Sequence, residues 1–233
     1  MAEPIIGILG GMGPEATADL YREIIRLTPA RKDQDHIPVL IYSNPKIPDR
    51  TRAILEGGED PLAYLIESAT LLQRMGAGIL AIPCNTAHYF LPQLAAAVQI
   101  PVLNMIEETY LALRATHPDS RAVGLLAATG TVRSGIYHAV FESRGISILV
   151  PDDAEQVKVH AAIAEVKSGE HGHSTRQTLE AIGANLLRKG AEAVILGCTE
   201  IPLVVDQESA GFACLNPTRI LAQAAIDWAL GKR

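Results

Sequence analysis

The chain has 233 residues and a formal net charge of −6, and no run of lysine and arginine forms a basic stripe. This balance argues against binding to nucleic acid or to an anionic membrane surface. Hydrophobic residues make up 48% of the chain, with only one Trp and three Phe, so the core must be built from aliphatic side chains, as in parallel α/β sheets.

The sequence shows no segment that would carry the chain to or across a membrane. Residues 1–4 lead directly into a predicted strand, and no apolar run approaches the ~20 residues that span a bilayer. The three cysteines are too few and too irregularly spaced for a disulfide framework. We therefore expect a cytoplasmic protein whose cysteines are thiols.

Apolar runs alternate with helical periodicity along the chain, which predicts a parallel sheet with crossover helices. The first elements are a strand over 5–9, a glycine loop, and a helix over 15–27 with Pro14 at its first position. Further strands are predicted over residues 36–42, 78–82, 122–126, 147–150, 193–196 and 212–215, and further helices over 62–75, 87–98, 132–143, 153–167, 175–189 and 218–230.

The two halves of the sequence repeat one pattern. The run Ile6-Gly7-Ile8-Leu9 followed by Gly13 recurs as Val123-Gly124-Leu125-Leu126 followed by Gly130. A second set recurs at a nearly equal offset, with Leu72, Arg74, Gly76, Ala77 and Cys84 matched by Leu186, Arg188, Gly190, Ala191 and Cys198. The repeat predicts two pseudo-symmetric α/β domains, each of three layers with a mainly parallel sheet.

We assign residues 1–105 with 210–233 to the first domain and residues 106–209 to the second. No low-complexity linker separates them, so the crossover near 103–107 is expected to be short. The last helix has no counterpart in the repeat, and we expect it to return to the first domain. Because ligands bind at the carboxyl ends of parallel strands, the active site is predicted in the cleft between the domains.

Cys84 and Cys198 occupy equivalent places, each just after an apolar predicted strand. Each is followed by a hydroxyl or amide side chain, and each opens a helix or turn whose N–H groups can stabilise a thiolate. A lone cysteine at a strand end is more often a small apolar residue, which is our interpretation of Cys214. The matched pair is better explained as two acid/base groups on opposite sides of one substrate atom.

Two other interpretations of these motifs were weighed. Residues 11–16 fit the dinucleotide fingerprint G-x-G-x-x-A, but Glu15 would face a pyrophosphate, and no acidic residue ends the second strand. The same loop suits a small carboxylate. Cys84, His88 and Cys198 are zinc-ligand types, but they form no compact cluster, so we expect neither a metal nor another cofactor.

Four segments resemble the aspartate/glutamate racemase family, specifically its aspartate racemase branch. They are residues 7–14, 43–50, 83–88 and 197–202, and the resemblance extends over nearly the whole chain. It implies a cofactor-independent racemase with two pseudo-symmetric α/β domains, an active site between them, and a homodimer. Racemisation removes an α-proton and returns one on the opposite face, and a thiolate and a thiol can do this together.

The same resemblance implies roles for further side chains. Arg50 and Lys167 would bind the two carboxylates of the substrate and stabilise the charge that develops on the α-carboxylate. Asn85, Thr86 and Thr199 would supply hydrogen bonds to the ammonium and carboxylate groups, and Met12, Thr129 and Thr131 would line the cleft. Independently of the resemblance, the positions of His88 and Glu200 shortly after Cys84 and Cys198 predict that they orient or protonate a thiol from behind it. Alternatively, His88 and Glu200 are polar residues that cap a helix or face solvent.

The expected function is therefore racemisation of acidic amino acids, aspartate first and glutamate second. These substrates differ by one methylene, which binding separates by only ~1–3 kcal/mol. The alternatives are a maleate isomerase or a related cysteine-dependent isomerase of the same superfamily, or a non-catalytic protein that binds dicarboxylates.

Overall fold

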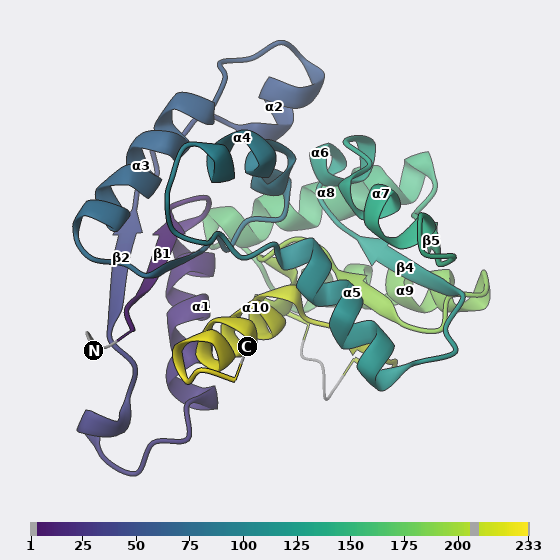
Figure 1. Ribbon diagram of the computed structural model, residues 1–233. Coiled ribbons are helices and arrows are strands. Elements are labelled where there is room, and N and C mark those ends of the chain that lie inside the picture. The colour runs from purple at the N-terminus through teal and green to yellow at the C-terminus, as the bar shows by residue number, and fades with distance from the viewer. Residues whose placement is uncertain (1–3, 206–209, 233) are drawn as a thin grey trace.

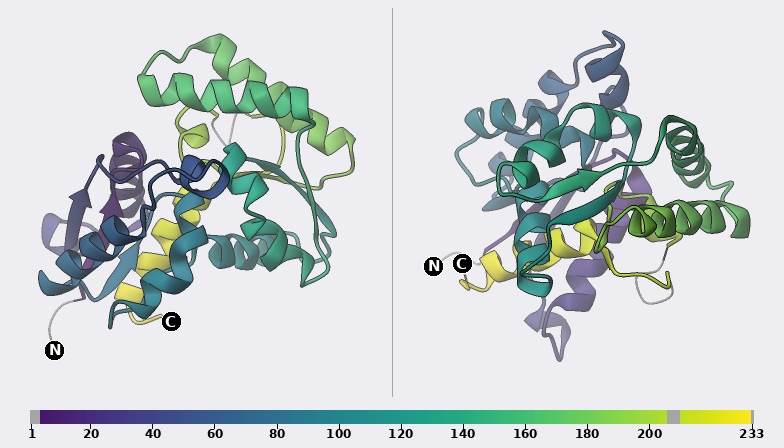
Figure 2. Two further views of the ribbon diagram at one scale, coloured as in Figure 1. Left: turned by 90° about the horizontal axis from the view of Figure 1, so that it is seen from above. Right: turned by 90° about the vertical axis from the view of Figure 1, so that its right-hand side faces the viewer.

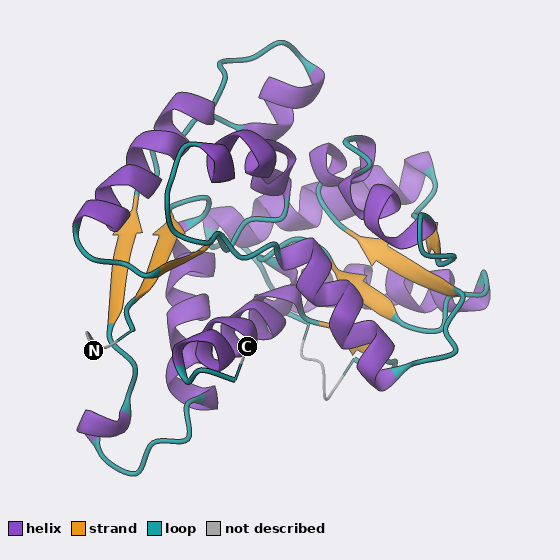
Figure 3. Ribbon diagram, viewed as in Figure 1, coloured by secondary structure: helices purple, strands orange, loops and turns teal. Residues whose placement is uncertain are grey.

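The computed structural model describes residues 4–205 and 210–232. Two separate parallel sheets, one in each half of the chain, are covered by helices (Figures 1 and 3). This is the two-domain α/β architecture with mainly parallel sheets that the sequence predicts. Within the described ranges, no helix is both long enough and apolar enough to cross a bilayer.

The first half contains a three-stranded sheet of order β2-β1-β3. Its strands are β1 (Ile6–Gly10), β2 (Val39–Ser43) and β3 (Ile79–Ala81). Its helices are α1 (Pro14–Leu27), α2 (Arg50–Leu55), α3 (Leu62–Arg74) and α4 (Leu91–Ala96), with short 3-10 helices η1 (Asp33–Asp35) and η2 (Thr86–Phe90). The central strand β1 is fully buried, as its unbroken apolar sequence predicts.

The second half contains a four-stranded sheet of order β5-β4-β6-β7. Its strands are β4 (Ala122–Leu126), β5 (Ser147–Leu149), β6 (Val194–Leu196) and β7 (Cys214–Leu215). The remaining helices are α5 (Met105–Thr116), α6 (Thr129–Arg133), α7 (Ile136–Glu142), α8 (Asp153–Ser168), α9 (His173–Arg188), η3 (Ile201–Leu203) and α10 (Pro217–Ala229). Helices α8 and α9 pack side by side, as Figure 2 shows in green.

The glycine loop after β1 is held in place by tight packing and by a threonine. Gly11 has a φ of 96° and lies against the backbone of Asn44, so a side chain there would clash with the loop after β2. The Thr17 hydroxyl accepts a hydrogen bond from the Gly11 amide at 2.8 Å and donates to the Gly13 carbonyl at 2.9 Å. The loops that follow β1 and β2 are therefore fixed against each other.

The repeat extends further than the sequence pattern indicated. Leu80 of β3 forms an isolated parallel bridge with Val102, which matches the pairing of Val194 with Cys214 in the second half. Each of these segments then leads into a helix capped by an asparagine side chain, Asn104 before α5 and Asn216 before α10. The last helix, α10, therefore has a counterpart in α5, contrary to the expectation from the sequence repeat.

The two equivalent helices are exchanged between the halves. Helix α10 packs against α1, and its buried face shares a core with Ile6 and Ile8 of β1. Helix α5 packs against α7, and its Ile106 and Leu113 share a core with strand β4. Figure 1 shows α10 lying between α1 and α5. The division into residues 1–105 with 210–233 and residues 106–209 stays a prediction.

Three helical predictions differ from the structure. The short crossover expected near residues 103–107 contains the start of α5, whose signals are the Asn104 cap and two acidic residues in the first turn. The single helix expected over 87–98 is η2 followed by α4, which has a proline in its first turn. The helix expected over 132–143 is interrupted at Gly135, which has a φ of 69°.

The two halves meet closely where α2 packs against α6. A Cβ at Gly130 would lie 2.9 Å from the Cα of Thr51, so neither helix could keep its place. We predict that Gly130→Ala lowers the free energy of unfolding by about 1 kcal/mol or more, because overpacking outweighs the gain in helix propensity. Chemical denaturation measures this difference.

Gln177→Ala is the control, because Gln177 is exposed in the interior of α9, where alanine is a good helix former. Its stability should stay within about 0.5 kcal/mol of the parent protein. Equal stability of the two variants would contradict the tight contact between α2 and α6.

Candidate active site

A small cavity lies between the carboxyl ends of the two sheets, and we call it the inner cavity. Its volume is about 20 Å³, close to the space that one water molecule needs. It is lined by Met12, Asp49, Arg50, Thr51, Cys84, Asn85, Thr86, Ala128, Lys167, Cys198, Thr199 and Glu200. The two equivalent cysteines thus enter one cavity from different halves of the chain.

Most of the side chains singled out in the sequence line this cavity, but three do not. Thr131 is fully buried directly behind Thr86, and their hydroxyl oxygens lie 2.7 Å apart. Thr129 lines a neighbouring cavity on the other side of Lys167. His88 lies behind Cys84 and is buried.

Cys198 is held by a carboxylate. Its thiol donates a hydrogen bond to Oε2 of Glu200 at 2.9 Å, and both side chains are buried. Burial and the negative charge of Glu200 raise the pKa of the Cys198 thiol well above its ordinary value. Cys198 therefore carries its proton at neutral pH.

Lys167 is the cation closest to this pair. Its Nζ lies 4.0 Å from Oε1 of Glu200, and its side chain is 41% exposed. Burial lowers the pKa of Lys167, but attraction to Cys198 and Cys84, when either is a thiolate, and to the Glu200 carboxylate outweighs that effect, so the pKa is raised overall. The ammonium group is thus placed where it stabilises a thiolate on either cysteine.

His88 acts on Cys84 through the backbone. Its Nδ1 lies 2.9 Å from the Cys84 carbonyl oxygen, and its Nε2 accepts a hydrogen bond from the Met105 amide at 3.0 Å. Burial lowers the pKa of His88, so the ring is neutral and Nδ1–H donates. With both nitrogens occupied by backbone groups, His88 orients the Cys84 loop and has no nitrogen left to protonate a thiol.

Three hydrogen bonds cross from one half to the other beside the cysteines. Besides the Thr86–Thr131 contact, the Thr199 hydroxyl donates to the Pro83 carbonyl at 3.4 Å. The Tyr137 hydroxyl, from α7, donates to Oδ1 of Asn85 at 2.6 Å. Each cysteine loop is therefore fixed against the opposite half.

The Tyr137 contact sets which way the Asn85 amide faces. Because Oδ1 accepts from Tyr137, Nδ2 is the atom that remains, and it is buried without a hydrogen-bond partner among the described residues. An unpaired buried N–H group is costly unless a ligand satisfies it. Sequence reasoning missed Tyr137, because no motif links it to Asn85 across the interface.

Arg50 is fixed by backbone carbonyl groups. Nη1 donates to Ile47 and Pro48 at 3.1 and 2.9 Å, and Nη2 donates to Met12 at 3.3 Å. The residue is only 9% exposed, and its Nε has no partner among the described residues. No carboxylate of the described chain pairs with this buried guanidinium, so its charge is available to an anionic ligand.

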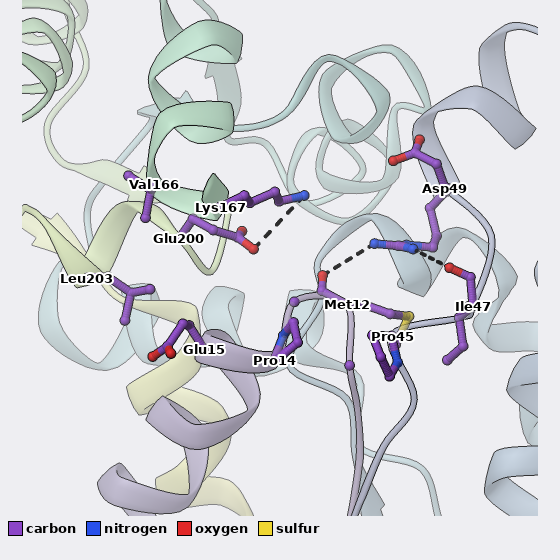
Figure 4. Close-up of a pocket in the computed structure, with 13 residues that line it drawn as sticks. Met12, Pro14, Glu15, Pro45, Ile47, Asp49, Val166, Lys167, Glu200 and Leu203 are labelled. Carbon is purple, nitrogen blue, oxygen red and sulfur yellow. Dashed lines mark hydrogen bonds and ion pairs between the residues drawn. The ribbon is translucent and has the colours of Figure 1, made fainter. Parts of the chain in front are cut away.

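A second cavity of about 420 Å³ adjoins the first, and we call it the outer cavity. Figure 4 shows side chains that line it, with Lys167 and Glu200 on one side and Ile47 and Asp49 on the other. Met12, Asp49, Arg50, Lys167 and Glu200 line both cavities. Asp49 was missed in the sequence, although it caps α2 directly before Arg50.

Among the described residues, no group of three or more His, Cys, Asp or Glu side chains is arranged so that it could hold a metal ion. The glycine loop after β1 lines the outer cavity and also contributes Met12 to the inner one. Glu15, in the first turn of α1, lines the outer cavity as well. The loop thus borders the cleft beside a carboxylate.

Known proteins resemble this chain over nearly its full length. It is 28% identical over 226 residues to the broad specificity amino-acid racemase RacX of Bacillus subtilis, covering 95% of this chain and 96% of that one. The aspartate racemase of Picrophilus torridus superposes with a TM-score of 0.87 at 31% identity, covering 97% and 94% of the two chains. An aspartate racemase homologue from Pyrococcus horikoshii superposes with a TM-score of 0.79 at 26% identity, covering 98% and 99%.

The family model for Asp/Glu/hydantoin racemases matches residues 9–225, which include both cysteine motifs and both sheets. Together with the similarity to the Picrophilus torridus enzyme, this match shows that the chain belongs to the Asp/Glu/hydantoin racemase family, an enzyme family of isomerases.

Proposed function

We propose that the protein racemises acidic amino acids without a cofactor, aspartate before glutamate, by proton transfer between Cys84 and Cys198. The observation that carries the proposal is that two equivalent cysteines from different halves line one small cavity. An α-carbon held between them would have one sulfur on each face. Proton removal and return on opposite faces then needs no movement of the substrate.

Cys198 is the thiol that starts the reaction as an acid. Cys198 keeps its proton, because burial and the Glu200 carboxylate raise its pKa. Cys84 makes no hydrogen bond to a carboxylate within the described residues and is the base that removes the α-proton. Cys198 then delivers its own proton from the other side, and the reverse reaction exchanges the roles.

The binding groups are arranged around the thiols. The unpaired Nδ2 of Asn85 and the Thr86 hydroxyl would bind the α-carboxylate, where negative charge builds up as the α-proton leaves. The side-chain carboxylate would lie between Arg50 and Lys167, which both line the inner cavity. Aspartate comes first because its short side chain keeps this second carboxylate close to the thiols.

We predict that Cys84→Ser and Cys198→Ser each lower the rate of aspartate racemisation by about 10²-fold or more, because serine is a much weaker acid than cysteine. Chiral chromatography of the product measures the rate. Cys214→Ser is the control, since Cys214 lies in β7 and lines neither cavity. Full activity in either of the first two variants would remove the two-base assignment.

We predict that Glu200→Gln lowers the pKa of Cys198. The substitution removes the negative charge beside the thiol and replaces the carboxylate acceptor with a neutral amide, so the thiolate should form at lower pH. The ultraviolet absorbance of the thiolate reports this titration in a Cys84→Ser/Cys214→Ser background, where Cys198 is the last cysteine. Glu15→Gln should leave the midpoint unchanged, and a midpoint that stays or rises in Glu200→Gln would contradict the assignment.

We predict that Arg50→Lys raises KM for aspartate by about tenfold or more, because an ammonium cannot keep the three carbonyl contacts and still present an N–H to a carboxylate. Steady-state kinetics measures the change. Arg52→Lys is the matched control on the same helix, where the side chain is 72% exposed and pairs with Glu56. Equal KM values in the two variants would argue against Arg50 as a carboxylate ligand.

A further inference from the structure

We propose that Glu200 binds the α-ammonium group of the substrate through Oε1, while Oε2 keeps its hydrogen bond from the Cys198 thiol. The proposal rests on the proposed function, because it takes the space between the two cysteines as the place of the α-carbon. It gives Glu200 a direct contact with the substrate in addition to its contact with a thiol.

Racemisation by two bases needs three fixed subsites. The hydrogen leaves one face of the α-carbon and another returns on the opposite face, while the α-carboxylate, the side chain and the ammonium group stay in place. Asn85 and Thr86 are proposed to hold the α-carboxylate, and Arg50 and Lys167 to hold the second carboxylate. The ammonium group is the substituent that still lacks a partner.

The buried side-chain atoms without a hydrogen-bond partner match these three substituents. Among the described residues that line the inner cavity, such atoms are Nε of Arg50, Nδ2 of Asn85 and Oε1 of Glu200. The two nitrogens are donors, which suit carboxylates, and the oxygen is an acceptor, which suits an ammonium group. An unpaired buried polar atom is costly unless a ligand satisfies it.

The two carboxylate oxygens of Glu200 have different surroundings. Oε2 accepts hydrogen bonds from the Cys198 thiol at 2.9 Å and from the Thr199 hydroxyl at 3.4 Å. Oε1 lies 4.0 Å from Nζ of Lys167, which is beyond hydrogen-bond distance (Figure 4). A Cβ at Gly13 would lie 3.4 Å from Oε1, so the glycine leaves this oxygen uncovered on that side.

Glu200 also has the burial that an ammonium subsite requires. An ammonium group that leaves water is stable only beside an opposite charge. Glu200 is 3% exposed, whereas Asp49, which also lines the inner cavity, is exposed and accepts a hydrogen bond from the Arg52 amide. Glu15 is exposed and lines only the outer cavity. The ammonium group is therefore assigned to Glu200.

The bound ammonium group would also act on Cys198. Burial and the negative charge of Glu200 raise the pKa of the Cys198 thiol in the free protein. A positive charge at Oε1 offsets the contribution of Glu200, so the thiol becomes a stronger acid once the substrate is bound. The same positive charge stabilises the negative charge that develops on the α-carbon.

The test measures ligand binding by calorimetry in a Cys84→Ser/Cys198→Ser variant of the full chain. This background cannot turn the substrate over by the proposed route, and the hydroxyl at position 198 can still donate to Glu200. The ligands are L-aspartate and succinate, which lacks the ammonium group. L-Aspartate should bind about tenfold or more tightly than succinate, because a buried hydrogen bond between charged groups is strong.

Adding Glu200→Gln should weaken the binding of L-aspartate by about tenfold or more, while succinate should bind equally or more tightly because a negative charge is removed. Asp49→Asn is the matched comparison, since it removes the same charge from a residue that lines the same cavity and keeps a good helix cap. Its ratio of L-aspartate to succinate affinity should stay within about threefold of the background value.

The subsite is overturned if succinate binds the background variant as tightly as L-aspartate does. It is also overturned if Glu200→Gln binds succinate with an unchanged affinity ratio, or if Asp49→Asn changes the ratio as much as Glu200→Gln. If Glu200→Gln binds neither ligand, the comparison in the background variant decides, because it needs no change at Glu200.

Racemisation of L-aspartate by the parent protein tests the proposed function separately. Turnover together with an affinity ratio that does not depend on Glu200 would remove the ammonium subsite alone. Binding that depends on Glu200, without turnover by the parent protein, would remove the proposed racemase function and leave the subsite.

Discussion

The structure depends on fixing two loops from different halves of the chain against each other, so that both cysteines line one cavity. Parallel sheets bring the loops to the cleft, because Cys84 and Cys198 each follow a strand paired beside the central strand of its sheet. Hydrogen bonds from Tyr137, Thr131 and Thr199 then cross the cleft beside the cysteines. A base and an acid on opposite faces of a carbon require this rigidity, since each proton transfer needs a short and well-aligned path.

The two equivalent cysteines have different surroundings. The backbone is repeated, but the side chains behind each thiol differ: Glu200 lies against Cys198, whereas His88 holds the backbone of Cys84. A carboxylate that accepts from a buried thiol keeps that thiol protonated. The repeat thus places two equivalent thiols at one cavity, and the proposed mechanism assigns the acid role to Cys198 on the basis of this local difference.

Much of the fold follows from the sequence, because buried parallel strands leave continuous apolar runs and the repeat relates the two halves. The packing of α5 and α10 on opposite halves could not be predicted in this way. The sequence of a helix identifies its apolar face, but it does not identify the sheet that this face covers. The same limit applies at the site. Loop motifs indicated Arg50 and both cysteines. The contact between Tyr137 and Asn85 could not be predicted, because it joins residues far apart in the chain. The placement of Thr129 in a neighbouring cavity depends on how the halves pack.

Proton exchange at the α-carbon tests the central claim most directly. The purified protein would be incubated with L-aspartate in deuterated water without added cofactor, with α-proton loss followed by NMR and chirality by chromatography. The account predicts that deuterium enters the α-position as D-aspartate forms, because the thiol on the opposite face would deliver a hydrogen that did not come from the substrate. Loss of the α-proton without inversion, or no exchange at all, would contradict proton transfer by two cysteines from opposite faces.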